Sequence, residues 1–181
     1  MNALKLPFKF DATIIKEEIA QFSKSDYYDI YNSSVTLKTL WAKHLIDPIG
    51  GPDTIPVFKP NEALKRCPYI LSILETFKCD KETFRIHTLD PKANIKPHRD
   101  AGYSFEQGKT RIHIPVETNN EVQLLLNDAP VRMKAGETWY CNFSIKHEVQ
   151  NNSSKHRTHL IMDCMVNDWL KDVFDKSLKV F

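Results

Sequence analysis

The first 80 residues carry hydrophobic positions mainly at helical spacing. The apolar residues Ile14, Ile15, Ile19 and Phe22 recur at helical spacing, and Asp11 is a suitable N-cap for a helix there. A second stripe of the same period predicts a helix from 61 to 77. Between these helices, residues 29–42 look extended or mixed, and residues 46–60 predict a loop because they hold four prolines and two glycines.

After Lys81 the hydrophobic pattern changes to short segments in which apolar and polar residues alternate. Seven or eight such segments follow at a spacing of about 8 to 12 residues, which is typical of a sandwich or barrel of β-strands. The segments are TFRIHTLD, IKPHRD, TRIHIPV, VQLLLN, VRMKAGETWYCNF, HEVQN and HRTHLIMDCMV. In the final stretch NDWLKDVFDKSLKVF, the apolar spacing predicts a helix capped by Asn167 or Asp168.

The chain is therefore expected to form one domain that is mainly β with flanking helices. Residues 1–80 would be an N-terminal helical support region, residues 81–167 the β core, and residues 168–181 a C-terminal helix. A chain of 181 residues is long enough to bury its own core without disulfides or a structural metal.

Charge and cysteine content narrow the class of protein. The net charge is only +2, and basic and acidic residues alternate along the chain, so neither a nucleic acid nor a membrane is expected as a partner. The sequence has no signal-like apolar run, and a cytoplasmic protein is expected. The four cysteines form no CxxC pair, which favours reduced thiols, although a bridge between two of them stays open.

In the second half of the chain, strand alternation predicts which polar residues lie on the same face of a strand. Arg111 and His113 share one face of their strand, opposite three aliphatic residues. The same parity groups His98 with Asp100. In the last strand it groups Arg157 with His159, Ile161 and Asp163.

A candidate metal site combines three of the polar residues. A single His-x-acid tripeptide is common by chance, but His98 and Asp100 are followed by His147 as the first residue of a later strand. Two imidazoles and one carboxylate are the ligands of the triad that binds Fe(II) in non-haem oxygenases, and they leave coordination positions open for substrates. Arg157, ten residues beyond His147, is suited to pair with the distal carboxylate of an oxo-acid bound to the same metal.

The stretch from Phe84 to Trp169 resembles the aspartyl/asparaginyl β-hydroxylase family of Fe(II)/2-oxoglutarate-dependent oxygenases. The resemblance lies in IKPHRDAG, in TRIHIPV, and above all in AGETWYCNFSIKHEVQNNSSKHRTHLIMD. It implies a double-stranded β-helix, a jelly-roll or cupin-like barrel, with the helices before Lys81 packed on its outside. It also implies Fe(II), O2 and 2-oxoglutarate as cosubstrate, with succinate and CO2 as coproducts.

The resemblance also implies roles for individual residues. His98 and His147 would bind iron, and Arg157 would hold the distal carboxylate of 2-oxoglutarate. Arg111 and His113 match the family's R-x-H strand, whose side chains point at the cosubstrate or the substrate. The best-known mammalian members lack the carboxylate of the triad, whereas Asp100 stands at that position here, as in some bacterial relatives that hydroxylate free amino acids.

The expected function is hydroxylation of an unactivated C–H bond in a free amino acid or a small amino-acid-like substrate. Cationic anchors for such a substrate would be Arg111, His113, Arg85 and Arg99, in that order. Three alternatives stay open: a hydroxylase of Asp or Asn residues in a peptide or protein, a cupin-like metal enzyme without 2-oxoglutarate, and a ligand-binding module. A nucleic-acid demethylase is disfavoured because the chain has no basic patch. The sequence leaves the oligomeric state open.

Overall fold

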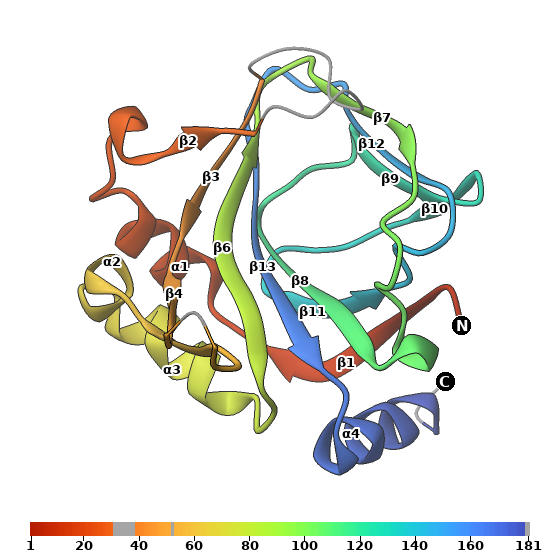
Figure 1. Ribbon diagram of the computed structural model, residues 1–181. Helices are drawn as coiled ribbons and strands as arrows, with labels where there is room; N and C mark the ends of the chain where they lie inside the picture. Colours follow the sequence, from red (N-terminus) through yellow and green to blue (C-terminus); the bar gives the residue numbers. More distant parts are fainter. Residues whose placement is uncertain (31–38, 52, 180–181) are drawn as a thin grey trace.

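Two antiparallel sheets face each other in the computed structural model, which describes residues 1–30, 39–51 and 53–179 (Figure 1). The larger sheet has, in spatial order, β1 (Ala3–Lys9), β11 (Glu137–Cys141), β8 (Lys109–Glu117), β13 (Arg157–Met165), β6 (Lys81–Leu89), β3 (Leu40–His44) and β2 (Tyr28–Asp29). The smaller sheet has the order β10 (Ala129–Val131), β9 (Val122–Leu126), β12 (His147–Asn151) and β7 (Asn94–His98). From β6 onward the chain passes back and forth between the two sheets, with β9 and β10 as a hairpin within the smaller sheet, which confirms the expected double-stranded β-helix.

The helices begin where the sequence places good N-caps. Helix α1 (Ala12–Ile19) starts after Asp11, whose carboxylate accepts from the Thr13 amide at 2.8 Å. Helix α4 (Asp168–Leu178) is capped by Asn167. The single helix expected over 61–77 is instead two helices, α2 (Glu62–Lys65) and α3 (Pro68–Thr76). The break has a simple cause, since Pro68 has no N–H to continue α2 but suits the first turn of a new helix.

The N-terminal 80 residues, expected as a helical support region, contribute strands to the sheets as well as helices. β1 and β3 extend the larger sheet, and the segment 46–60, expected as a loop, forms the hairpin of β4 (Ile46–Ile49) and β5 (Val57–Pro60). The strands β2 and β3 agree with the extended character expected over 29–42, of which residues 31–38 lie outside the described residues. These strands are short, so period-two alternation gives little signal within them.

The two faces of the larger sheet differ in character. Its outer face carries Ile112, Ile114, Leu160 and Met162, which belong to one hydrophobic core with residues of α1, α3 and α4. The helices therefore pack outside the barrel, as expected (Figure 1). The inner face carries the alternate residues of β8 and β13, among them Arg111, His113, Arg157 and Ile161. A second, smaller hydrophobic cluster lies between the two sheets, with residues such as Leu124 from the smaller sheet.

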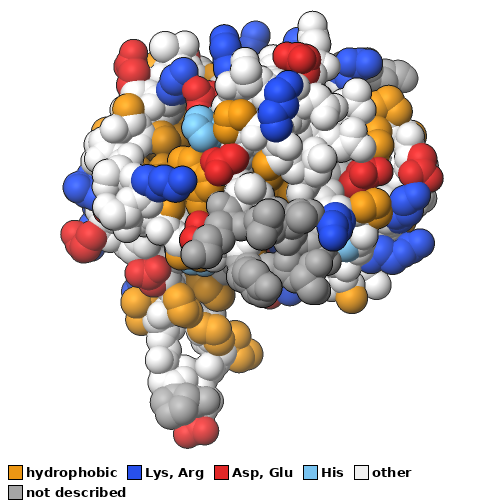
Figure 2. All heavy atoms as spheres, turned by 90° about the horizontal axis from the view of Figure 1, so that it is seen from above, with side chains coloured by type: hydrophobic (Ala, Val, Ile, Leu, Met, Phe, Trp, Pro, Cys, Tyr) orange, Lys and Arg blue, Asp and Glu red, His pale blue; other side chains and the backbone are white. Residues whose placement is uncertain are grey.

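The surface shows no broad patch of one charge in the view of Figure 2, where basic and acidic side chains are interspersed. The β4–β5 hairpin projects from the body in the same view and carries the exposed side chains of Ile49, Ile55 and Val57. All four cysteines are buried and unpaired, as expected. Within the described residues, none of the helices has the length and apolar character needed to cross a membrane.

Candidate active site

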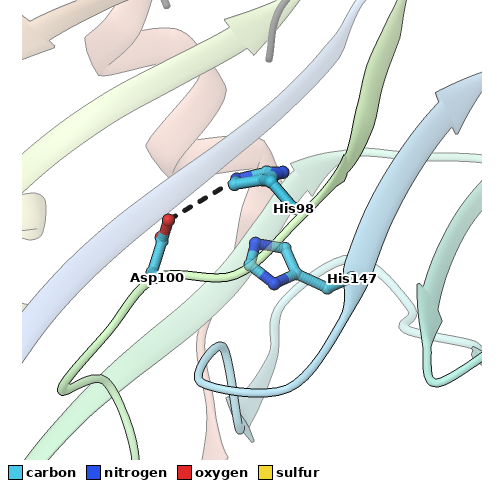
Figure 3. Close-up of side chains that lie close together, drawn as sticks. All are labelled: His98, Asp100 and His147. Carbon is cyan, nitrogen blue, oxygen red and sulfur yellow. Dashed lines mark ion pairs between the residues drawn. The ribbon is translucent and has the colours of Figure 1, made fainter.

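Three side chains that can bind a metal meet where β7, the edge strand of the smaller sheet, pairs with β12. His98 ends β7, His147 begins β12, and the two residues are direct cross-strand partners. Asp100 follows two residues after His98, in the turn beyond β7 rather than within the strand as expected. The side chains point toward one another (Figure 3), and one potential ligand atom from each lies within 4.8 Å of the others. The distance from His98 Nε2 to Asp100 Oδ1 is 3.5 Å.

Both imidazoles are held in the orientation that metal binding needs. Nδ1 of His98 lies 2.8 Å from the Lys96 carbonyl oxygen, and Nδ1 of His147 lies 3.0 Å from the Ile145 carbonyl oxygen. A carbonyl oxygen only accepts, so each Nδ1 carries the proton and each Nε2 keeps its lone pair. Burial also lowers the pKa of His147, which favours its neutral form. Two imidazole nitrogens and a carboxylate form a donor set that fits Fe(II).

Arg111 connects this cluster to a buried carboxylate. Its Nη1 donates to Asp100, while Nε and Nη2 donate to the two oxygens of Asp163 at 2.7 and 3.1 Å. Arg85 and Thr83 also donate to Asp163. Burial alone would raise the pKa of Asp163, but Arg111 and Arg85 outweigh it and hold that pKa below its usual value. Arg111 therefore fixes the orientation of Asp100, and three of its five N–H groups already point at carboxylates.

Arg157 is the opposite case, a buried guanidinium with no anionic partner among the described residues. Its exposed fraction is 1%, and its donors reach only the Nδ1 atoms of His159 at 3.0 Å and His87 at 3.4 Å. Its Nε has no hydrogen-bond partner in the described structure. Burial lowers the pKa of Arg157 to about 9. A buried charge is normally paired, so this position fits a carboxylate supplied by a ligand.

The donors of Arg157 also fix the tautomers of the neighbouring histidines. Burial, and then the charge of Arg157, hold the pKa values of His87, His113 and His159 well below their usual value, so all three are neutral. Because a guanidinium only donates, Nδ1 of His87 and of His159 must accept, and each carries its proton on Nε2. Nδ1 of His113 lies 3.2 Å from Nδ1 of His159, so His113 is the donor and its Nε2 keeps a lone pair.

A single cavity of about 190 Å³ joins these groups. The metal-site residues and Arg157 line it together with Arg85, Arg111, His87 and His113. Its apolar wall consists of Ile30, Leu40, Ile95, Phe143, Val149 and Ile161. All six residues expected in the site, His98, Asp100, Arg111, His113, His147 and Arg157, are therefore brought together. Of the further anchors considered, Arg85 lines the cavity, whereas Arg99 is exposed and does not.

Sequence analysis did not identify the part played by two neighbours of the site. His87 accepts from Arg157, and Asp163 holds Arg85 and Arg111. Strand parity placed Asp163 on the same face as Arg157, but its partners depend on the pairing register of β13 with β6 and β8, which alternation alone does not give.

Comparison with known proteins agrees with this geometry. The chain is 30% identical over 164 residues to L-proline cis-4-hydroxylase of Rhizobium meliloti (strain 1021), a match that covers 86% of this chain but only 58% of the relative. Two solved structures share the fold. An oxidoreductase of the 2OG-Fe(II) oxygenase family from Burkholderia pseudomallei has a TM-score of 0.62 at 14% identity, covering 92% of this chain and 85% of that one. A Pseudomonas putida prolyl-4-hydroxylase has a TM-score of 0.52 at 13% identity, covering 92% and 93%.

The family assignment rests on the sequence over most of the chain. Residues 9–166 match aspartyl/asparaginyl β-hydroxylase, a span that includes every strand from β6 to β13 and all six site residues. The chain belongs to the aspartyl/asparaginyl β-hydroxylase family.

Proposed function

We propose that this chain is an Fe(II)- and 2-oxoglutarate-dependent hydroxylase of a free amino acid or a small amino-acid-like compound. The observation that carries the proposal is the position of Arg157, a buried cation without an anion, in the same cavity as a His-Asp-His cluster. A cosubstrate that chelates a metal at one end and carries a carboxylate at the other end matches both features.

In this proposal His98, Asp100 and His147 hold the metal. Bound Fe(II) with 2-oxoglutarate and O2 supplies the oxidation, in which one oxygen atom enters a C–H bond and the other enters succinate as CO2 leaves. The chain holds the ligands in place through the Lys96 and Ile145 carbonyls, which orient the two imidazoles. Arg111 does the same for Asp100.

The remaining residues of the cavity position the organic ligands. Arg157 binds the distal carboxylate of the cosubstrate, assisted by the Nε2–H donor that its hydrogen bond fixes on His87. His113 presents a lone pair on Nε2, which has no partner among the described residues and is available to an N–H or O–H group of cosubstrate or substrate. The apolar wall of the cavity excludes water around the reacting C–H bond.

The relative's activity supports the choice of substrate class. An L-proline cis-4-hydroxylase acts on a free amino acid, so L-proline is the first compound to test. The chain spans 58% of that relative's length, and the specificity of the shorter chain is therefore a separate question for experiment. We also expect the protein to act in the cytoplasm, where its four unpaired thiols would stay reduced.

The test combines a binding assay with turnover. Anaerobic addition of Fe(II) and 2-oxoglutarate should give a weak absorption band at about 500 nm, as chelation of an open iron site by a keto acid requires. Succinate formation is then measured with each of the twenty amino acids and with short Asp- or Asn-containing peptides. We expect a free amino acid to increase succinate formation. Its product should be about 16 Da heavier than the amino acid, since one oxygen atom is added.

A matched pair of variants distinguishes the loss of an arginine in the cavity from the loss of an arginine on the surface. Arg157→Gln should lose the response to 2-oxoglutarate, whereas Arg66→Gln, at an exposed position outside the cavity, should keep it. A colourless mixture and no succinate at saturating Fe(II) and 2-oxoglutarate would overturn the hydroxylase proposal. If only peptides increased succinate formation, the substrate would be a peptide and not a free amino acid.

A further inference from the structure

A second cavity is lined by Arg157 but by none of the three residues of the metal cluster. It has a volume of about 300 Å³, and we call it the rear cavity. Arg157 and Val149 belong to both cavities and so form the wall between them. The other lining residues of the rear cavity are Thr118, Asn119, Asn120, Val122, Leu124, Val131, Arg132, Met133, Lys134, Ala135 and His159.

The charge of the rear cavity is one-sided. Arg132 and Lys134 line it from the loop between β10 and β11, and both residues are exposed. Neither side chain forms an ion pair with any described residue, and none of the lining residues is acidic. With Arg157 in its wall, the cavity therefore gathers three cations and no anion. Free cations on a surface are common, so this feature alone would not define a site.

His159 supplies the independent observation. Its exposed fraction is 3%, and it lines the rear cavity but not the catalytic one. Because its Nδ1 accepts from Arg157, its proton is on Nε2, and this N–H has no acceptor among the described residues. A buried donor without an acceptor is costly and is normally satisfied. The reaction proposed above makes no use of this donor.

We propose that the rear cavity binds a small carboxylate with a short apolar tail, at a site separate from that of 2-oxoglutarate. The carboxylate would accept from His159 Nε2–H at the inner end and be attracted by Arg132 and Lys134. The tail would lie on the aliphatic side chains of β9, β10 and β12 that line the cavity. A zwitterionic amino acid fits less well, since its ammonium group would face three cations and no acid.

The shared wall has a consequence for the reaction. Two carboxylates on opposite sides of Arg157 would share one guanidinium charge, so each should weaken the binding of the other. A carboxylate in the rear cavity would therefore raise the concentration of 2-oxoglutarate needed for half-saturation. The coupling is reciprocal, so saturating 2-oxoglutarate should weaken the rear site by the same factor.

Methionine methyl groups provide a direct probe of the rear cavity. The chain has four methionines, and Met133 lines this cavity whereas Met162 lies in the helix-covered core and Met165 is exposed at the end of β13. The protein is labelled at the methionine methyls with 13C, loaded with Zn(II) and 2-oxoglutarate to fill the catalytic site, and titrated with butyrate at constant ionic strength. We expect a saturable shift of the Met133 signal, with Met162 and Met165 unchanged.

Variants test whether the cations are responsible. Arg132→Gln combined with Lys134→Gln should weaken butyrate binding by about tenfold, since hydrogen bonds and ion pairs to a carboxylate are lost. Lys171→Gln combined with Lys176→Gln removes the same charge from α4, outside both cavities, and should leave the titration unchanged.

Three results would overturn the inference. The first is the absence of a saturable Met133 shift, and the second is an unchanged affinity in the Arg132/Lys134 variant. The third is a Met133 shift produced by 2-oxoglutarate itself that blocks butyrate, because the rear cavity would then be part of the cosubstrate site. The inference does not rest on the hydroxylase proposal, since the same titration on the metal-free protein without 2-oxoglutarate reports on the rear cavity even if no turnover is found.

Discussion

Acidification should destabilise the fold through the three buried histidines around Arg157. Burial and the adjacent guanidinium hold the pKa values of His87, His113 and His159 well below their usual value in the folded protein. In the unfolded chain each returns to an ordinary pKa of about 6.5. Above that pH neither state binds the protons, and the stability is fully present. As the pH falls below about 6.5, only the unfolded chain takes up protons, so stability is lost.

The size of the effect follows from the number of groups. One group that binds a proton only in the unfolded state changes the free energy of unfolding by about 1.4 kcal/mol per pH unit. Because the unfolded pKa is about 6.5, this full slope applies only below that pH. Between pH 7.5 and 5.5 each histidine should therefore lower the free energy of unfolding by about 1.4 kcal/mol, most of it below pH 6.5. The three together should lower the free energy of unfolding by about 4 kcal/mol, a large part of the stability of an ordinary domain.

Urea unfolding of the metal-free protein at several pH values, followed by tryptophan fluorescence, measures this dependence. His159→Asn keeps an oxygen that can accept from Arg157 but removes one titrating group, so the loss over the same range should become smaller by about 1.4 kcal/mol. A free energy of unfolding that stays constant between pH 7.5 and 5.5 would refute the reasoning. It would mean that these histidines bind protons in the folded state despite their burial beside a cation.

Three further predictions concern single residues. Arg157→Gln should weaken 2-oxoglutarate binding by about 2 to 5 kcal/mol, measured by calorimetry with Zn(II), because the distal carboxylate loses its buried partner; unchanged binding would assign that task to another cation. His147→Ala should abolish iron binding in equilibrium dialysis, and a wild-type iron content would remove His147 from the metal site. Gly136→Ala should destabilise the fold by more than about 3 kcal/mol in urea unfolding, since its φ is +78° and a Cβ would lie 2.1 Å from the Phe10 carbonyl oxygen. Gly108→Ala is its control, with φ +84° but open space, and should cost only about 1 to 2 kcal/mol; equal losses would contradict the role of the contact.

Most of the correct sequence predictions about the site came from the alternation of apolar and polar residues along single strands. It placed Arg111 and His113 on the face opposite Ile112, and it grouped Arg157 with His159, and both groupings hold in the structure. Local signals also located the helix caps at Asp11 and Asn167. These features depend on residues close together in the sequence, where the period of a helix or a strand is a sufficient guide.

What the sequence could not give depends on pairing between distant segments. β1 joins the larger sheet only because it pairs with β11, more than 120 residues later. The contact of Arg111 with both Asp100 and Asp163 likewise needs a turn and two strands in a particular register. The tautomers around Arg157 need the side chains of β6, β8 and β13 together. Interactions of this kind arise from the tertiary arrangement and leave no local periodicity.

Because His98 on β7 pairs with His147 on β12, a bound metal should stabilise the edge strand β7. β7 is the last strand in the order of the smaller sheet, and its register with β12 is interrupted next to His147. An ion held by both imidazoles would act as a cross-link between this outer strand and its inner neighbour. Removal of the metal by a chelator should then destabilise β7 locally. Hydrogen exchange and protease cleavage should become faster around residues 94–100 before they become faster on the helix-covered side of the molecule.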